Sequence, residues 1–83
     1  MNLLYFAMIR ENIGKSSETI DLPIDVKTVS ELLTYLESKG ENYVSAFAQD
    51  DLIRVAVNQE YVGLNQAVSN DDEIAIFPPM TGG

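Results

Sequence analysis

The sequence has 83 residues, of which 46% are hydrophobic, and it carries 13 acidic side chains against five basic ones. A chain of this size forms one small domain, which excludes a separate catalytic domain with a deep pocket. The net charge of −8 and the scattered basic residues exclude nucleic acid and an anionic membrane surface as partners, because phosphate groups are neutralised by clustered lysine and arginine.

The first part of the chain predicts two strands. Residues 2–9 are aromatic and aliphatic in both alternating sets, which favours a strand that is apolar on both faces. Residues 11–17 contain glycine and small polar residues, which are typical of a loop. Residues 18–22 alternate in polarity as far as Pro23 and predict a second strand, which we expect to form a hairpin with the first.

A capping box marks the start of a helix that we expect over residues 29–39. Thr28 has the N-cap position, and Glu31 lies three residues later. Lys39 and Gly40 are typical of a helix end, a cation in the last turn followed by a residue that can adopt the left-handed conformation. The side chains at helical spacing predict a stripe that packs in the core: Val29, Leu32, Leu33 and Leu36.

The second half predicts short elements. Residues 43–47 indicate a helical turn, which Asp50-Asp51 breaks, and residues 53–57 indicate a third strand. Asn58-Gln59 fits a tight turn into a short strand near Tyr61. A further turn over residues 68–72 then leads into the last strand, over residues 73–77.

This order of elements predicts an α+β protein with the β-grasp, or ubiquitin-like, fold. We expect a mixed sheet of four to five strands with one main helix packed on one face. The first and last strands are both strongly apolar, so we expect them side by side at the centre of the sheet. Residues 1–77 form the β-grasp domain in this interpretation, and residues 78–83 form a flexible tail.

The tail is the only part of the chain that offers chemistry. It reads Phe77-Pro78-Pro79-Met80-Thr81-Gly82-Gly83, in which the prolines favour a stiff spacer and the glycines fit a channel too narrow for a side chain. The reactive group at its tip is the α-carboxylate of Gly83. The body has no cysteine or histidine, so it lacks thiol chemistry, the usual general base and a zinc site. Its acidic runs lack the spacing of a calcium loop.

Three stretches resemble the MoaD/ThiS sulfur-carrier family, and within it the molybdopterin branch: Tyr5–Glu11, Val57–Gln59 and Asp72–Gly83. The closing Phe-Pro-Pro-x-x-Gly-Gly is the most specific of them, because carriers of the thiazole pathway usually lack the two prolines. Asp71 departs from the family, which commonly has glycine there. Aspartate tolerates a positive φ, so the departure concerns the turn and not the tail.

The resemblance implies a sulfur-donating small subunit of molybdopterin synthase. A MoeB-type enzyme would use ATP and magnesium to adenylate Gly83, and a sulfur donor, a sulfurtransferase, would convert it to a thiocarboxylate. The tail residues Pro78, Pro79, Met80, Thr81 and Gly82 would then enter a MoaE-type large subunit. There Gly83 would donate sulfur to cyclic pyranopterin monophosphate to form the dithiolene of molybdopterin. The implied assembly has two small and two large subunits, with no cofactor or metal bound by the body.

The outer face of the sheet is the expected partner-binding surface. The side chains expected there are Leu4, Phe6 and Met8 of the first strand, Ala75 and Phe77 of the last, and Tyr61. The resemblance matches Phe6, Tyr61 and Phe77 to positions that pack against the large subunit. Arg10 and Arg54 are expected to pair with acidic groups at the rim. The alternative is that residues 43–49 of this chain cover the face.

Two other functions stay open: a sulfur carrier for thiazole synthesis or another pathway, and a ubiquitin-like binding module or conjugated modifier. Catalysis by this chain alone is disfavoured, because its acid–base groups are too few. No apolar run approaches a membrane span, and the first residues lack the basic and apolar regions of a signal peptide. We therefore expect a cytoplasmic protein.

Overall fold

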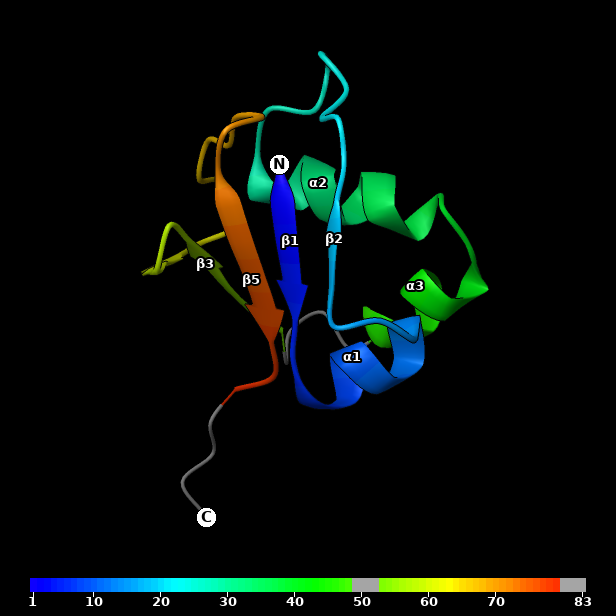
Figure 1. Cartoon of the computed structure of the whole chain (residues 1–83). Helices are drawn as coiled ribbons and strands as arrows, with labels where there is room; N and C mark the ends of the chain where they lie inside the picture. The colour runs from blue at the N-terminus through cyan, green and yellow to red at the C-terminus, as the bar shows by residue number, and fades with distance from the viewer. Residues whose placement is uncertain (49–52, 80–83) are drawn as a thin grey trace.

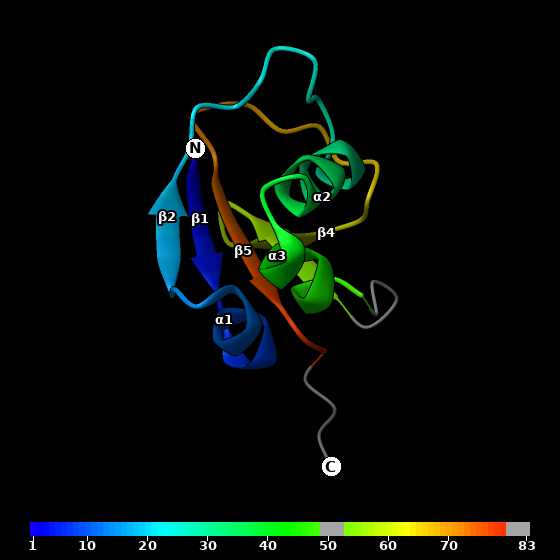
Figure 2. The ribbon, with the colours of Figure 1, turned by 90° about the vertical axis from the view of Figure 1, so that its right-hand side faces the viewer.

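A computed structural model describes residues 1–48 and 53–79 of the chain. In these ranges a mixed sheet of five strands has helices packed against one of its faces (Figures 1 and 2). The α+β, β-grasp prediction is confirmed. The elements in chain order are β1 (Asn2–Tyr5), α1 (Ala7–Ile13), β2 (Ser17–Thr19), α2 (Val29–Glu37), α3 (Glu41–Ala46), β3 (Arg54–Val57), β4 (Glu60–Val62) and β5 (Glu73–Phe77).

The two strands at the ends of the domain lie side by side in the middle of the sheet. The strand order is β2-β1-β5-β3-β4, and β1 pairs with β5 in parallel while the other neighbours pair antiparallel (Figure 1). Leu3 lies opposite Ile74 and Tyr5 opposite Ile76. The predicted adjacency of the first and last strands is therefore confirmed. In this arrangement the last described residues of the chain leave from a central strand.

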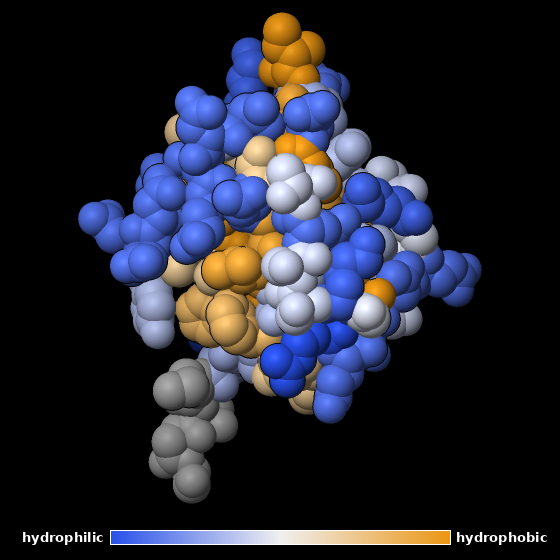
Figure 3. Space-filling model, in the orientation of Figure 1, coloured by the Kyte–Doolittle hydropathy of each residue, from blue (hydrophilic) through white to orange (hydrophobic). Residues whose placement is uncertain are grey.

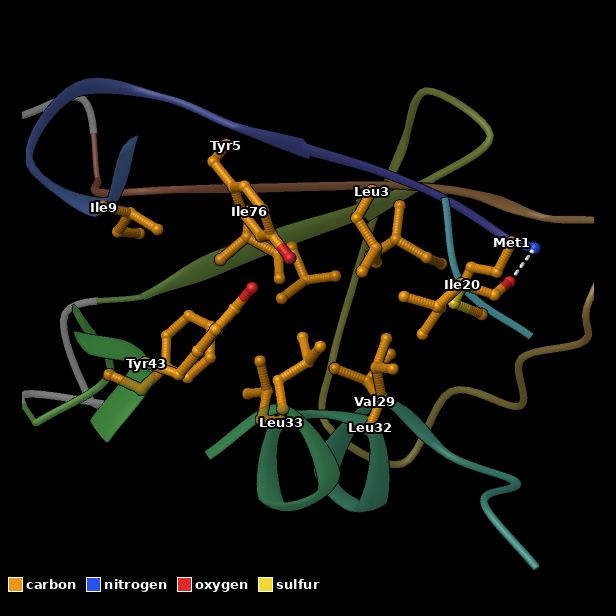
Figure 4. Close-up of a cluster of buried hydrophobic side chains, with 14 of the residues drawn as sticks. Met1, Leu3, Tyr5, Ile9, Ile20, Val29, Leu32, Leu33, Tyr43 and Ile76 are labelled. Carbon is orange, nitrogen blue, oxygen red and sulfur yellow. Dashed lines mark hydrogen bonds between the residues drawn. The ribbon is translucent and has the colours of Figure 1, made fainter. Parts of the chain in front are cut away.

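The core lies between the sheet and α2, where both elements present apolar side chains. Leu3, Ile74 and Ile76 alternate inward from β1 and β5, and none of them has any exposed surface. From α2, the predicted stripe of Val29, Leu32, Leu33 and Leu36 faces these strands and is buried (Figure 4). Burying an aliphatic side chain of this size stabilises the fold by about 1.5–3 kcal/mol, so this contact fixes α2 on the inner face.

The capping box of α2 is confirmed, but the predicted helix end is wrong. Thr28 Oγ1 accepts a hydrogen bond from the Glu31 N–H at 3.2 Å, and a Glu31 carboxylate oxygen accepts from the Thr28 N–H at 3.1 Å. The helix ends at Glu37, with Ser38 as a right-handed C-cap. Gly40 is extended, with φ of 160°, and precedes α3. Gly40 instead allows a close approach of the Asn42 side chain, because a Cβ at this position would lie 2.8 Å from the Asn42 amide oxygen.

Replacing the N-cap side chain should destabilise the domain. Thr28→Ala removes the acceptor for the Glu31 N–H, so we expect the free energy of unfolding to fall by about 1 kcal/mol. Thr34→Ala is the matched control, because Thr34 lies on the exposed face of the same helix and alanine has the higher helix propensity. Urea unfolding would measure both variants, and an equal loss of stability in the two would contradict the role of the capping box.

The N-terminal third differs from the predicted hairpin. The pairing of β1 with β2 is confirmed, but β1 ends at Tyr5 and the connection contains α1, so the predicted strand over residues 6–9 and loop over residues 11–13 are wrong. The Phe6 N–H still donates to the Ile76 carbonyl, and Ala7 then turns the chain with φ of 53°. The buried side chains of α1 are one helical turn apart and face the core: Ile9 and Ile13.

The second half confirms the remaining elements. Helix α3 contains the predicted turn over residues 43–46, and Asp50-Asp51 lie outside the described residues. Asn58 and Gln59 connect β3 and β4 with φ of 51° and 73°, the positive values that a type I′ hairpin turn requires. Asp71 does not have a positive φ, so aspartate replaces the usual glycine without backbone strain.

A polar cluster lies at the edge of the core, where β1, β2 and α3 meet. Glu18 Oε2 accepts hydrogen bonds from the hydroxyls of Tyr5 at 2.7 Å and Tyr43 at 2.6 Å. Figure 4 shows these two hydroxyls pointing toward one another. The ammonium groups of Lys15 and Lys39 lie 3.5 and 4.0 Å from Glu18 Oε1. Glu18 thus satisfies two tyrosine hydroxyls whose rings belong to the core.

Candidate functional site

An apolar groove of about 430 Å³ lies on the outer face of the sheet, the face opposite the helices. We call it the outer groove. Figure 3 views this face and shows hydrophobic side chains gathered toward its lower end, with hydrophilic ones around them. The residues that line the groove come from four strands or their ends and from the start of α1: Phe6, Ala7, Ala56, Gln59, Tyr61, Ala75, Phe77, Pro78 and Pro79.

Two aromatic rings form one wall of the outer groove. Tyr61 on β4 and Phe77 on β5 have ring centroids 5.4 Å apart at an interplanar angle of 49°. Tyr61 is 77% exposed and Phe6 is 44% exposed, although both are large aromatic side chains. Alternation along the strands produces this arrangement, because Ile74 and Ile76 face the core while Ala75 and Phe77 face outward.

The structure brings four of the predicted partner-binding residues together and places three elsewhere. Phe6, Tyr61, Ala75 and Phe77 all line the outer groove. Leu4 lies opposite Ala75 in the sheet but does not line the groove. The remaining two predicted contacts are on α1 and not on a first strand: Met8, which is 61% exposed, and Arg10, which is also exposed.

Arg54, the other residue expected at the rim, lies near the end of β5. It lies opposite Phe77 on the neighbouring strand β3 and is exposed. Its guanidinium donates to the Ile53 carbonyl at 3.0 Å. A positive charge therefore lies beside the point where the chain leaves β5.

The alternative in which residues 43–49 cover the outer face is wrong for the described residues 43–48. Helix α3 packs against α1 and α2, on the helical side of the molecule (Figure 2). Tyr43 and Phe47 are buried there, with 4% and 3% of their surface exposed. Within the described ranges, the outer groove is therefore open to solvent.

The tail begins inside the outer groove. Pro78 and Pro79 directly follow β5, and both are among the lining residues. Met80, Thr81, Gly82 and Gly83 lie outside the described residues. A partner that fills the groove would therefore contact the first two residues of the tail as well as the sheet.

Three lining residues were not predicted from the sequence: Ala7, Ala56 and Gln59. The outward position of Ala56 could have been predicted from strand alternation, because its neighbours on β3, Val55 and Val57, face inward. Gln59 follows from the type I′ turn, which places it beside the outward face of β4. Ala7 has no such signal, since its place depends on the turn between β1 and α1.

The outer groove is suited to binding and not to acid–base chemistry. Among the residues that the structure describes, Tyr61 is the only ionisable one that lines it. Residues 1–48 and 53–79 contain no group of three or more histidine, cysteine, aspartate or glutamate side chains placed to hold a metal ion. No helix in the same ranges is long and apolar enough to cross a membrane. A second hollow, of about 580 Å³, runs beside α2 and is lined in part by the polar side chains Asp25, Ser30 and Glu31.

A protein-family model, described as the ThiS family, matches residues 3–83. The chain belongs to the ThiS family. One relative that matches over almost its whole length is the protein named molybdopterin synthase sulfur carrier subunit from Haemophilus influenzae. It is 42% identical over 83 residues, which cover 100% of this chain and 99% of the relative. The resemblance that the sequence suggested is thereby confirmed.

Solved structures of other proteins share the fold. SAMP1 from Haloferax volcanii is 33% identical, with a TM-score of 0.79 over 100% of this chain and 98% of that one. A protein–protein complex of subunits 1 and 2 of molybdopterin-converting factor from Helicobacter pylori contains a chain with a TM-score of 0.64. That chain is 20% identical over 99% of this chain and 96% of its own length, which is a likeness of fold.

Proposed function

We propose that this chain is the sulfur-carrier subunit of a molybdopterin synthase. The observation that carries the proposal is that the apolar outer groove and the Phe-Pro-Pro-Met-Thr-Gly-Gly tail are continuous, since Pro78 and Pro79 line the groove. Membership of the ThiS family and the 42% identical relative with that name support it. In this proposal the carrier docks on its partner through the outer groove, and the tail delivers the sulfur.

The chemistry belongs to the carboxylate of Gly83. A carboxylate resists nucleophilic attack, so in our proposal a MoeB-type enzyme first joins it to AMP, using ATP and magnesium and releasing pyrophosphate. A thiol reductant then releases sulfide from a sulfurtransferase, and the sulfide displaces AMP and leaves a thiocarboxylate. The body of the chain binds none of these cofactors in this scheme. Its contribution is to present a tail whose prolines are stiff and whose last two residues, Gly82 and Gly83, carry no side chain.

The proposed acceptor complex contains a MoaE-type large subunit. The Helicobacter pylori complex of subunits 1 and 2 supports such a partner, because one of its chains has the fold described here. Pro78, Pro79, Met80, Thr81 and Gly82 would enter the large subunit, so that Gly83 reaches the cyclic pyranopterin monophosphate. We propose two small and two large subunits per complex, working in the cytoplasm. We further propose that Arg54, which lies opposite Phe77 at the base of the tail, pairs with an acidic group of the partner at the rim.

Intact-mass spectrometry tests the proposal. The chain is incubated with a MoeB-type enzyme, ATP, magnesium and a sulfurtransferase with its sulfur source, and the expected mass gain is that of one oxygen replaced by sulfur. Addition of a large subunit and the pterin precursor should then return the original mass and yield the dithiolene. An unchanged mass, under conditions in which a known carrier is modified, would count against the proposal.

A second candidate is a ubiquitin-like modifier, and the similarity to SAMP1 favours it. SAMP1 of Haloferax volcanii also has a solved structure under the name small archaeal modifier protein 1. In this case the activated Gly83 would form an isopeptide bond with a lysine of another protein. Mass spectrometry of trypsin-digested cell extracts distinguishes the two, because the modifier leaves residues 55–83, the fragment after the last basic residue Arg54, on target lysines and the carrier leaves none.

The exposed ring of Tyr61 should matter for docking more than for folding. In Tyr61→Ala we expect the dissociation constant for the large subunit to rise about 30-fold, as for an aromatic residue at the centre of an interface. Its free energy of unfolding should fall by at most about 1 kcal/mol, the value of its contact with Phe77. Ile24→Ala is the control, because Ile24 is 95% exposed but does not line the groove. Calorimetric titration would show equal affinities for both variants if the outer groove were not the docking surface.

A further inference from the structure

Gln59 has a backbone conformation that favours glycine. It is the second residue of the two-residue turn between β3 and β4, with φ of 73°. In type I′ turns this position is usually glycine, because a Cβ in the left-handed region approaches the following carbonyl. Non-glycine residues in strained conformations cluster at functional sites, so the glutamine calls for a reason outside the turn.

The positive φ of the neighbouring residue, Asn58, is compensated by hydrogen bonds within the chain. It also has a positive φ, but its side chain donates to Asp72 Oδ1 at 2.9 Å and accepts from the Glu73 N–H at 3.0 Å. These bonds tie the turn to the start of β5. Within residues 1–48 and 53–79, the carboxamide of Gln59 has no hydrogen-bond partner, and its side chain is exposed. Nothing in the described fold compensates for the strain at Gln59.

Gln59 is also chemically distinct from its surroundings. Of the nine described residues that line the outer groove, eight are aliphatic, aromatic or proline, and only Gln59 presents a carboxamide. A carboxamide both donates and accepts hydrogen bonds, so its complement is another amide. A charged partner group would lose hydration against this apolar surface without an opposite charge from Gln59. A main-chain amide supplies the matching donor and acceptor at a smaller desolvation cost.

We propose that Gln59 is a specificity-determining residue of the docking surface. Its carboxamide exchanges hydrogen bonds with a main-chain amide of the large subunit, in a segment that places an apolar side chain in the outer groove beside Tyr61 and Phe77. The inference rests on the proposed function, because it takes the large subunit as the occupant. In this arrangement the strain at Gln59 destabilises the free carrier, and the hydrogen bonds of its carboxamide stabilise the complex.

The test uses Gln59→Gly in the full chain and measures two quantities that should move in opposite directions. Glycine relieves the strain, so we expect the melting temperature to rise by about 2–6 °C. It also removes the carboxamide, so we expect the dissociation constant for the purified large subunit of the same organism to rise by about threefold to tenfold. Gln59→Leu keeps the strain and side-chain bulk without the amide, and its affinity should fall by a similar factor.

Asn58→Gly is the matched control, since it relieves a positive φ in the same turn but leaves Gln59 in place. It should lower the melting temperature, because the bonds to Asp72 and Glu73 are lost, and it should leave the affinity unchanged. The proposal is overturned if Gln59→Gly binds as tightly as the original chain, if its melting temperature does not rise, or if Asn58→Gly weakens binding equally. If the original chain does not bind the large subunit at all, the proposed function itself fails.

Discussion

A chain extended by one residue after Gly83 should lose sulfur transfer by at least about a hundredfold. The extension turns the Gly83 carboxylate into an amide and moves the new carboxylate by about 3.5 Å, the length of one residue. A displacement of that size takes the reacting group out of a productive geometry, for which even 1 Å can cost about a hundredfold. Docking through the outer groove should remain measurable, because the body is unchanged.

The measurement is single-turnover formation of the dithiolene, together with the mass of the carrier after the activation step. An extension of the same size inside the loop over residues 63–68 serves as the control, because that loop does not line the groove. Full transfer by the extended tail would contradict a mechanism at the Gly83 carboxylate. Loss of both docking and transfer would show that the tail, and not the groove, supplies the binding energy.

Glu18→Ala should be the most destabilising single change at a partly exposed position, with a loss of about 2–4 kcal/mol in the free energy of unfolding. Tyr5 and Tyr43 both donate to this carboxylate, and both rings are buried. Hydrogen bonds to a charged group stabilise by about 1.5–3 kcal/mol, and a buried hydroxyl left without an acceptor is costly. Glu18→Gln keeps an oxygen acceptor, so it should lose less. Urea unfolding at neutral pH checks the order of the two variants.

The same cluster predicts how stability changes with pH. Burial opposes ionisation of Glu18, but the hydrogen bonds from Tyr43 and Tyr5 and the nearby Lys15 and Lys39 outweigh it and lower the pKa of this carboxyl below 4.5. A lowered pKa in the folded state stabilises the protein above the unfolded value and loses that contribution as the pH falls through the folded value. Urea unfolding between pH 6 and pH 3 should therefore show a steeper loss for the original chain than for Glu18→Gln.

At alkaline pH the tyrosines act in the opposite sense. Burial, followed by the hydrogen bond to Glu18, raises the pKa of Tyr43 from 10.0 to about 12, and the same causes raise the pKa of Tyr5. Their contribution to stability is complete below pH 10, the unfolded value, and is lost as the pH rises through the folded values. Stability should thus be greatest at pH values above the range in which Glu18 is protonated and below the range in which Tyr5 and Tyr43 ionise.

The sequence predicted the elements in which the hydrophobic residues clearly followed either the helical or the strand period. It failed where the hydrophobic residues fitted both periods. The leucine stripe of α2 and its capping box identified the main helix, and the alternation of β5 identified the last strand. Residues 6–9 are apolar at every position, so the strand and helix patterns were not distinguishable there. The pair Ile9 and Ile13, one helical turn apart and followed by Gly14 with φ of 92°, is the signal for α1 in hindsight.

The outer groove was partly predictable for the same reason. Phe77, Ala75 and Tyr61 follow from strand alternation, whereas Met8 was placed wrongly because its element was assigned wrongly. The Glu18 cluster was not predictable, because it joins residues 13 and 25 positions apart and depends on the packing of α3. Interactions of that kind arise from tertiary structure, and no short pattern in the sequence announces them.

The parallel pairing of β1 with β5 has a consequence for how the protein is made. The strand at the start of the chain gains its central neighbour only when residues 73–77 have left the ribosome, so the sheet closes over almost the whole sequence separation. Folding of high contact order is slow, and it follows synthesis here instead of accompanying it. The outer groove contains residues of β5, so a truncated or unfolded chain lacks the proposed docking surface. Recognition by a partner thereby selects carriers that are both complete and folded.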